Sequence, residues 1–129
     1  MSVVENKDLI KRYIDEVWNK GVVDLLDDLY DPSFTGGGYG GIPELSAAIT
    51  SYRKSFPDLH FTIEDAVAED ERIAYRWIAR GTHQGEFAGI APTGKPITVT
   101  GITILRIVDG KIIDDRSETT NRTLTEQLE

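Results

Sequence analysis

The strongest constraint on the fold is a change in hydrophobic periodicity near Leu59. Before this residue apolar side chains recur at helical spacing, and after it they alternate with polar ones as in half-buried strands. Strand-like runs cover about residues 59–69, 72–85, 95–108 and 111–119. The turn-like pairs Asp70-Glu71 and Asp109-Gly110 favour hairpins between these runs. The pattern therefore predicts an antiparallel meander in the second half of the chain.

The residues before the meander predict three helices. The first should run from about Glu5 to Lys20 with one apolar face. A second, shorter helix ends at Asp31, because the residue before a proline is driven out of the helical region. A third begins near Pro43. Helices followed by a meander define an α+β fold, with the helices on one side of the sheet and a single domain over residues 1–129.

Composition excludes several classes of partner. The chain has 129 residues, with 14 Lys and Arg against 22 Asp and Glu, and a net charge of −8 at pH 7. Its scattered basic residues form no positive stripe for a phosphate backbone or an anionic membrane, so neither nucleic acid nor membrane is expected as a partner. No apolar run approaches the roughly 18 residues of a membrane span. Cysteine is absent, and we expect a cytoplasmic protein.

Five short strings, in order along nearly the whole chain, resemble those of the SnoaL-like polyketide cyclase family within the nuclear transport factor 2-like superfamily. They are YIDEVWNKG at 13–21, FPDL at 56–59, GTHQGEF at 81–87, GIAPTGK at 89–95 and DGKII at 109–113. The resemblance implies a cone-shaped α+β barrel, in which helices pack on a strongly curved sheet and enclose a pocket. It also implies acid–base chemistry on a flat aromatic polyketide, with no metal and no cofactor.

The resemblance breaks down at the expected catalytic acid. Family cyclases tend to carry a His-Trp pair after the last turn and, a few residues later, an Asp that acts as general acid/base. Counted without gaps from Gly110, this chain has Asp115-Arg116 at the pair and Thr120 at the acid. The family register turns the strand face of Arg116 and Glu118 toward the pocket. If this face lines the pocket, Arg116 and Glu118 form a partly buried charge pair, in which Arg116 could orient a substrate carbonyl and Glu118 could transfer a proton, and Thr120 lines the pocket. The alternative is an edge strand whose charges are solvated.

Histidine offers a second candidate for acid–base work. His83 lies in one of the strings that resemble the family, so it could move a proton or donate a hydrogen bond. A purely structural role for His83 is the alternative. His60 and His83 are the only histidines and lie 23 positions apart in a chain without cysteine, which is not metal-ligand spacing.

Aromatic residues are the candidates for pocket lining. Tyr13, Tyr75 and Trp77 lie on the faces that the pattern turns toward the helix–sheet interior, and they serve equally well as core filler. Tyr39 stands in the glycine-rich segment 36–41, which we interpret as a flexible lid over the pocket.

The sequence therefore predicts a cofactor-independent enzyme acting on a small hydrophobic, carbonyl-bearing molecule. A hydroxylase or epoxide-hydrolase-like enzyme on the same fold, and a non-catalytic small-molecule-binding module, remain alternatives. We also expect a homodimer joined through the convex sheet face, because Ile78, Ile102 and Ile104 fall on the face away from the helices.

Overall fold

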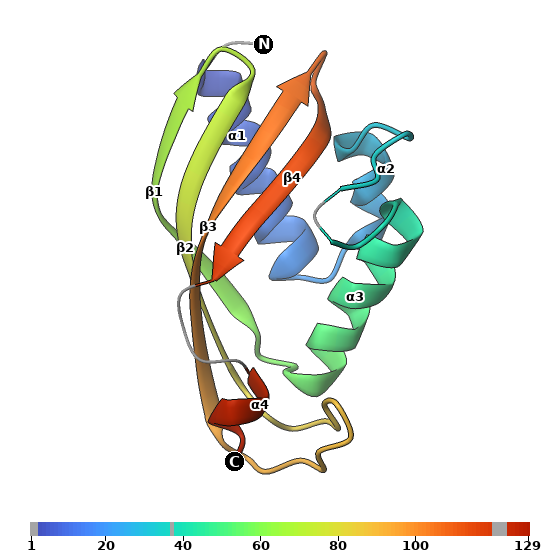
Figure 1. Ribbon diagram of the computed structural model, residues 1–129, viewed down its shortest axis with the longest axis vertical. Coiled ribbons are helices and arrows are strands. Elements are labelled where there is room, and N and C mark those ends of the chain that lie inside the picture. The colour runs from blue at the N-terminus through green and yellow to red at the C-terminus, as the bar shows by residue number, and fades with distance from the viewer. Residues whose placement is uncertain (1–2, 37, 120–123) are drawn as a thin grey trace.

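The computed structural model of the protein describes residues 3–36, 38–119 and 124–129. Helical segments fill the first part of the chain, and a four-stranded sheet fills most of the remainder (Figure 1). The helical elements are α1 (Val3–Arg12), the π-helix η1 (Tyr13–Trp18), the 3₁₀ segment η2 (Val23–Leu25), α2 (Leu26–Leu29), α3 (Ile42–Ser55) and α4 (Leu124–Gln127). The strands are β1 (His60–Glu69), β2 (Arg72–Thr82), β3 (Pro96–Val108) and β4 (Lys111–Thr119).

The strands form one antiparallel sheet in the order β1-β2-β3-β4, which confirms the predicted meander. Two of the hairpin turns lie where the sequence predicts them. Asp70 and Asp109 adopt positive φ angles of 53° and 51°, as the favoured hairpin turns require. Strand β2 ends at Thr82 rather than near residue 85, because the amides of Gln84 and Gly85 leave the ladder and donate to the Ser55 carbonyl of α3.

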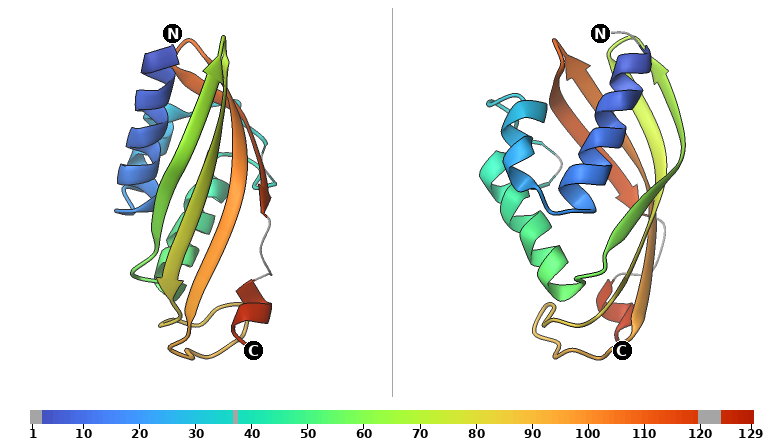
Figure 2. Two further views of the ribbon diagram at one scale, coloured as in Figure 1. Left: turned by 90° about the vertical axis from the view of Figure 1, so that its left-hand side faces the viewer. Right: turned by 180° about the vertical axis from the view of Figure 1, so that it is seen from behind.

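The helices α1, α2 and α3 lie on one side of a strongly curved sheet, as predicted (Figure 2). The architecture is the cone-shaped α+β fold that the resemblance implied. Helix α4 lies against the first residues of β3. There the Gln127 side-chain amide donates one hydrogen bond to the main chain of Thr98 and accepts another from it, both of 2.9 Å. This arrangement leaves the concave face of the sheet turned toward the helices.

One apolar core joins the concave face to the helices. Inward-facing residues of the sheet such as Ile73, Leu105 and Ile112 are fully buried. They belong to the same core as the apolar faces of the helices, which contribute Ile10, Val17, Leu26, Leu45 and Ile49. Each such side chain removed from water contributes about 1.5–3 kcal/mol, so the helix–sheet contact dominates stability. The alternate residues Ile102 and Ile104 remain 43% and 49% exposed on the opposite face.

The first helix differs from the sequence prediction, which expected one continuous α-helix to Lys20. The α-helix ends at Arg12, and the next six residues form a π-helix. In a π-helix the backbone bonds join residues five apart. Tyr13 and Trp18 stand at this spacing, and the Trp18 Nε1–H donates to the Tyr13 hydroxyl at 2.8 Å between two buried rings. The side-chain pair therefore stabilises the wider turn.

Candidate active site

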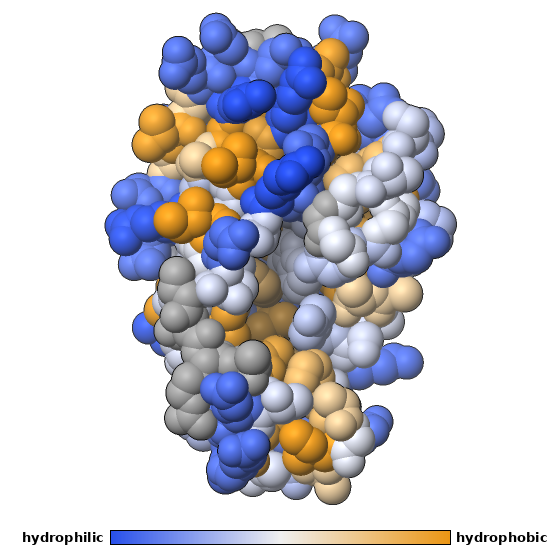
Figure 3. All heavy atoms as spheres, in the orientation of Figure 1, coloured by the Kyte–Doolittle hydropathy of each residue, from blue (hydrophilic) through white to orange (hydrophobic). Residues whose placement is uncertain are grey.

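A cavity of about 270 Å³ lies between the concave face of the sheet and the helices. The space-filling view in Figure 3 shows a hollow on this side of the molecule with apolar side chains at its floor. Most of the wall is aromatic or aliphatic, and the polar side chains gather on β3 and β4. The lining residues are Tyr13, Ile14, Trp18, Tyr39, Tyr52, Phe56, Leu59, Phe61, Tyr75, Trp77, Ala79, Ile97, Val99, Thr103, Asp115, Ser117, Thr119 and Leu124.

Asp115 on β4 is the single acidic group among the described residues that line the cavity. Its side chain is buried, with 6% of the residue exposed. The hydroxyl of Tyr30, at the end of α2, donates to Asp115 Oδ2 at 2.9 Å. Burial raises the pKa of the Asp115 carboxyl; the bond from Tyr30 acts in the opposite direction, and the nearby Asp114 charge adds to the rise. Asp115 is thus a carboxyl group with an elevated pKa facing an apolar cavity.

Four tyrosines surround this carboxyl group: Tyr13, Tyr30, Tyr39 and Tyr75. Burial is the main cause that raises the pKa of each hydroxyl, and the charge of Asp115 raises all four further. The pKa of Tyr39 rises to about 12. These hydroxyls therefore stay protonated at neutral pH, and that of Tyr30 donates to the acid.

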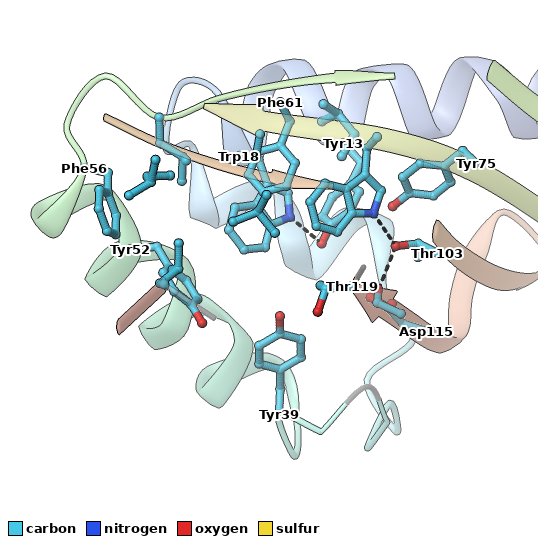
Figure 4. A pocket seen from close by; sticks show the side chains of 18 residues that line it. Tyr13, Trp18, Tyr39, Tyr52, Phe56, Phe61, Tyr75, Thr103, Asp115 and Thr119 are labelled. Carbon is cyan, nitrogen blue, oxygen red and sulfur yellow. Dashed lines mark hydrogen bonds between the residues drawn. The ribbon is translucent and has the colours of Figure 1, made fainter. Parts of the chain in front are cut away.

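A short chain of hydrogen bonds lies beside Asp115 (Figure 4). Trp77 Nε1–H on β2 donates to Thr103 Oγ1 on β3 at 2.9 Å. The Thr103 and Ser117 hydroxyls are 2.7 Å apart, which links β3 to β4. Ser117 and Thr119 continue the polar strip along β4 on the cavity side. The cavity therefore combines one acid with a row of neutral hydroxyls.

The structure places the predicted aromatic residues at the cavity. Tyr13, Tyr75 and Trp77 line it from η1 and β2, and Tyr39 points into it from the glycine-rich loop (Figure 4). The proposed mobility of that loop stays a prediction. Thr120, the fifth predicted pocket residue, lies outside the described residues.

The predicted orientation of the last strand is wrong. Arg116 and Glu118 point away from the cavity, opposite the exposed Ile104 and Ile102 of β3. The Arg116 side chain is 81% exposed and forms a solvated ion pair with Asp114, with 3.3 Å between Arg116 Nε and Asp114 Oδ2. The solvated alternative therefore describes these charges, and the cavity side of β4 carries Asp115, Ser117 and Thr119 instead.

A β-bulge explains this reversal. Next to the hairpin turn, Val108 pairs with Lys111 and Ile107 with Ile112, but the ladder then skips Ile113. Beyond the skip Leu105, which faces inward, pairs with Asp115. Without the unpaired Ile113, Leu105 would pair with Asp114 instead of Asp115. Arg116 and Glu118 would then face inward together with Asp114, because a one-residue slip exchanges the two faces of a strand.

Asp115 is the candidate site residue that the sequence did not predict. Nothing in the alternation of β4 reveals the bulge, so strand parity could not find Asp115. The available signal was its position: an ungapped count from Gly110 aligns Asp115 with the family's histidine. An ionisable side chain at that position was the clue.

His83 is fully buried but does not line the cavity. Its Nδ1 accepts a hydrogen bond of 3.1 Å from the Thr93 amide, and its ring packs against Phe56 with 5.7 Å between ring centroids. Phe56 itself lines the cavity, so His83 packs against a residue of the cavity wall. This geometry favours the structural alternative, in which His83 fixes the loop after β2.

Two further properties concern the described residues. Across 3–36, 38–119 and 124–129, no group of three or more His, Cys, Asp or Glu side chains is arranged to hold a metal ion. Within the same part of the chain, no helix has the length and apolar character needed to cross a membrane.

The protein is therefore a cone-shaped α+β fold that encloses an apolar cavity with a buried acid on its wall. The chain belongs to the SnoaL-like polyketide cyclase family, which it matches over residues 8–128. It is 30% identical over 104 residues to the aklanonic acid methyl ester cyclase AcmA of Streptomyces galilaeus, a match that covers 75% of this chain and 72% of AcmA.

Solved structures of Streptomyces proteins show the same fold. AclR of Streptomyces galilaeus, to which a hydroxylase activity is ascribed, superposes with a TM-score of 0.86 at 28% identity over 98% of this chain and 86% of its own. IdmH of Streptomyces antibioticus, to which a polyketide cyclase activity is ascribed, gives 0.80 at 28% identity over 95% of this chain and 96% of its own. The resemblance expected from the sequence is confirmed.

Proposed function

We propose that the protein is an enzyme that moves protons on a small, neutral, carbonyl-bearing molecule, with Asp115 as the general acid/base and no cofactor. One observation carries the proposal: among the described residues, a buried carboxyl group that accepts a hydrogen bond from the Tyr30 hydroxyl is the single acid lining a mostly apolar cavity. A carboxyl group with a raised pKa is a stronger base in its ionised form.

The cavity walls support a flat, apolar substrate. Trp18, Phe61 and Trp77 form an aromatic cluster with ring centroids 4.8 and 5.1 Å apart, and all three line the cavity. Aromatic walls of this kind favour planar ring systems, and a cavity near 270 Å³ is at the small end of ligand pockets. Membership of the SnoaL-like polyketide cyclase family, and the likeness to AcmA, whose name gives aklanonic acid methyl ester as the molecule it cyclises, support a polyketide-like substrate.

The chemical step follows from the position of the acid. The ionised Asp115 carboxylate removes a proton from the carbon next to the substrate carbonyl, and the electron pair of that C–H bond moves onto the carbonyl oxygen as an enolate. The enolate carbon then attacks a second carbonyl of the same molecule, and the proton returns from Asp115 to the new alkoxide. This sequence closes a ring without an external oxidant or reductant.

The proposal is tested with 2-tetralone, a flat, neutral bicyclic ketone with an acidic C–H beside its carbonyl. Exchange of that hydrogen for deuterium in D₂O, followed by proton NMR, measures the first step alone. We expect the parent protein to accelerate exchange and Asp115→Asn to lose about 10²–10⁴-fold of that acceleration. Glu118→Gln is the matched control, since Glu118 is an acid on the same strand that faces away from the cavity.

The test also separates the alternatives. If the parent and Asp115→Asn proteins both bind 2-tetralone and neither accelerates exchange, the proposed proton transfer is contradicted, and a binding module is supported where no oxygenated product forms either. The hydroxylase alternative, which the likeness to AclR supports, would leave exchange unaccelerated and yield an oxygenated product from its own substrate.

We further propose that the protein acts in the cytoplasm as a homodimer joined through the convex face of the sheet. The support is a set of apolar residues on that face, where Val67, Ile102 and Ile104 are 71%, 43% and 49% exposed. Val67 and Ile104 both pair with Ala74 of β2, so they form one row across three strands. Exposed apolar patches of this kind mark interfaces.

A further inference from the structure

We propose that Ser117 donates a hydrogen bond to the carbonyl oxygen of the substrate, and that Trp77 and Thr103 set the direction of this bond. The inference rests on the proposed function and adds to it the group that holds the negative charge of the enolate. It also restricts the substrate to a neutral ketone or ester.

The direction of the hydrogen-bond chain begins at Trp77. An indole N–H can only donate, so in the contact of 2.9 Å with Thr103 Oγ1 the threonine accepts. Both residues are buried, at 8% and 3% exposure. Gly101 makes this arrangement possible, because a Cβ at that position would lie 2.5 Å from Trp77 Cζ2. The backbone of β3 therefore holds the indole in place.

The next hydrogen bond in the chain joins the Thr103 and Ser117 hydroxyls. A threonine hydroxyl has two lone pairs and one proton. Trp77 occupies one lone pair, and the proton of a buried hydroxyl needs an acceptor. The Thr103 proton is then left for Ser117 Oγ, 2.7 Å away. Ser117 receives that bond and keeps its own proton for an acceptor in the cavity, which it lines.

The spacing of Ser117 and Asp115 matches the reaction. The two residues are next neighbours on one face of β4, so their Cα atoms are about 6.7 Å apart. A carbonyl group and its adjacent carbon fit between them, with the oxygen at Ser117 and the C–H at Asp115. A donor aimed at the oxygen stabilises the enolate as charge develops there.

The charge of the cavity supports a hydroxyl in this role. Among the described residues that line it there is no Lys, Arg or His, so neutral hydroxyls are the donors available for a substrate oxygen. The Arg116 guanidinium, which the sequence reasoning placed here, lies on the other face. A substrate carboxylate would meet Asp115 without a compensating cation, and the site therefore selects neutral molecules.

Infrared spectroscopy of bound 2-tetralone labelled with ¹³C at the carbonyl tests the inference. The measurement is made in the Asp115→Asn background, so it does not depend on catalysis. A hydrogen bond lowers the carbonyl stretching frequency, and we expect the bound band to lie below its position in an apolar solvent. Ser117→Ala should return the carbonyl band most of the way to its position in the apolar solvent. Ser117→Thr should retain the full shift, and Thr103→Val should reduce the shift. Glu118→Ala, on the opposite face, should leave the band unchanged.

The outcomes distinguish this inference from the proposed function. With Asp115 intact, Ser117→Ala should slow deuterium exchange by up to about 10²-fold. A carbonyl band that stays shifted in Ser117→Ala overturns the role of Ser117, even where Asp115 is required for exchange. A band that moves with Ser117 in a protein without exchange activity supports the hydrogen bond and contradicts the proposed catalysis. Failure of 2-tetralone to bind contradicts both.

Discussion

Two aspartates on opposite faces of the same sheet have pKa values that move in opposite directions. Asp115 faces the helices, and burial raises its pKa. Asp65 faces solvent on β1 and receives two hydrogen bonds from Arg76, at 2.8 and 3.2 Å, which lower its pKa. Both belong to polar stretches of amphipathic strands. The difference shows that the helices, by excluding water from one face, raise the pKa of a carboxyl group on it.

The largest effect is expected from moving the acid across its strand. In a protein carrying Asp115→Asn together with Arg116→Asp, a carboxylate is retained one residue further along but on the solvated face. We expect it to lose 2-tetralone exchange by the same factor of about 10²–10⁴ as Asp115→Asn alone. Proton NMR of the exchange measures both proteins. Recovery of activity in the double variant would show that the two faces are equivalent.

The convex face is tested by its effect on association. Ile104 is half-exposed, so its remaining burial in a dimer is worth about 1 kcal/mol in each copy. Ile104→Glu should therefore weaken a symmetric dimer by at least about 30-fold, with charge repulsion adding to the loss. Sedimentation velocity over a range of concentrations measures the dissociation constant. A parent protein that is monomeric at micromolar concentration contradicts the homodimer.

The bond from Tyr30 to Asp115 is tested by the pH dependence of exchange. Because this bond lowers the Asp115 pKa, Tyr30→Phe should raise it further. Asp115 acts as a base when ionised, so the midpoint of the rise in exchange rate should move to higher pH in the variant. Tyr52→Phe, which removes a hydroxyl elsewhere on the cavity wall, should leave the midpoint in place. An unchanged midpoint in Tyr30→Phe would show that the bond does not tune the acid.

The smallest effects concern stability, and they should have opposite signs. The folded-state pKa of Asp115 lies above its unfolded value of about 3.9, so its ionisation weakens folding. Relative to Asp115→Asn, the parent should lose stability as pH rises through the Asp115 pKa. Asp65 has a lowered pKa, so relative to Asp65→Asn the parent should lose stability as pH falls through it. Urea unfolding at several pH values measures both differences, and parallel curves would contradict the comparison.

Much of the fold could be predicted from local patterns. Strand alternation and the turns at Asp70 and Asp109 led to the meander, and the observed bounds of β1, β3 and β4 agree within a residue with those expected. The π-helix could not be predicted, because the apolar spacing of Tyr13 and Trp18 also suits one face of an ordinary α-helix. A side-chain bond between the two residues depends on the packing around them.

Only part of the candidate site could be predicted from the sequence, because the rest depends on how two strands pair. The aromatic walls followed from residues that face inward on β2 and from the glycine-rich loop. The acid did not, because a single unpaired residue at Ile113 inverts every later position of β4. The bulge is a property of the pairing between β3 and β4, and the sequence of either strand alone does not reveal it.

The π-helix also has an evolutionary consequence. A turn closed by bonds between residues five apart contains one residue more than an α-helical turn, so η1 is equivalent to a single-codon insertion in an α-helix. Loss of that codon would restore a regular helical turn and leave the residues on either side in phase, because the wider turn absorbs the extra residue. Tyr13 and Trp18 would then be four residues apart instead of five, and the spacing of their side-chain hydrogen bond would change. A gain or loss of one residue can thus alter the site while every side chain that remains is the same.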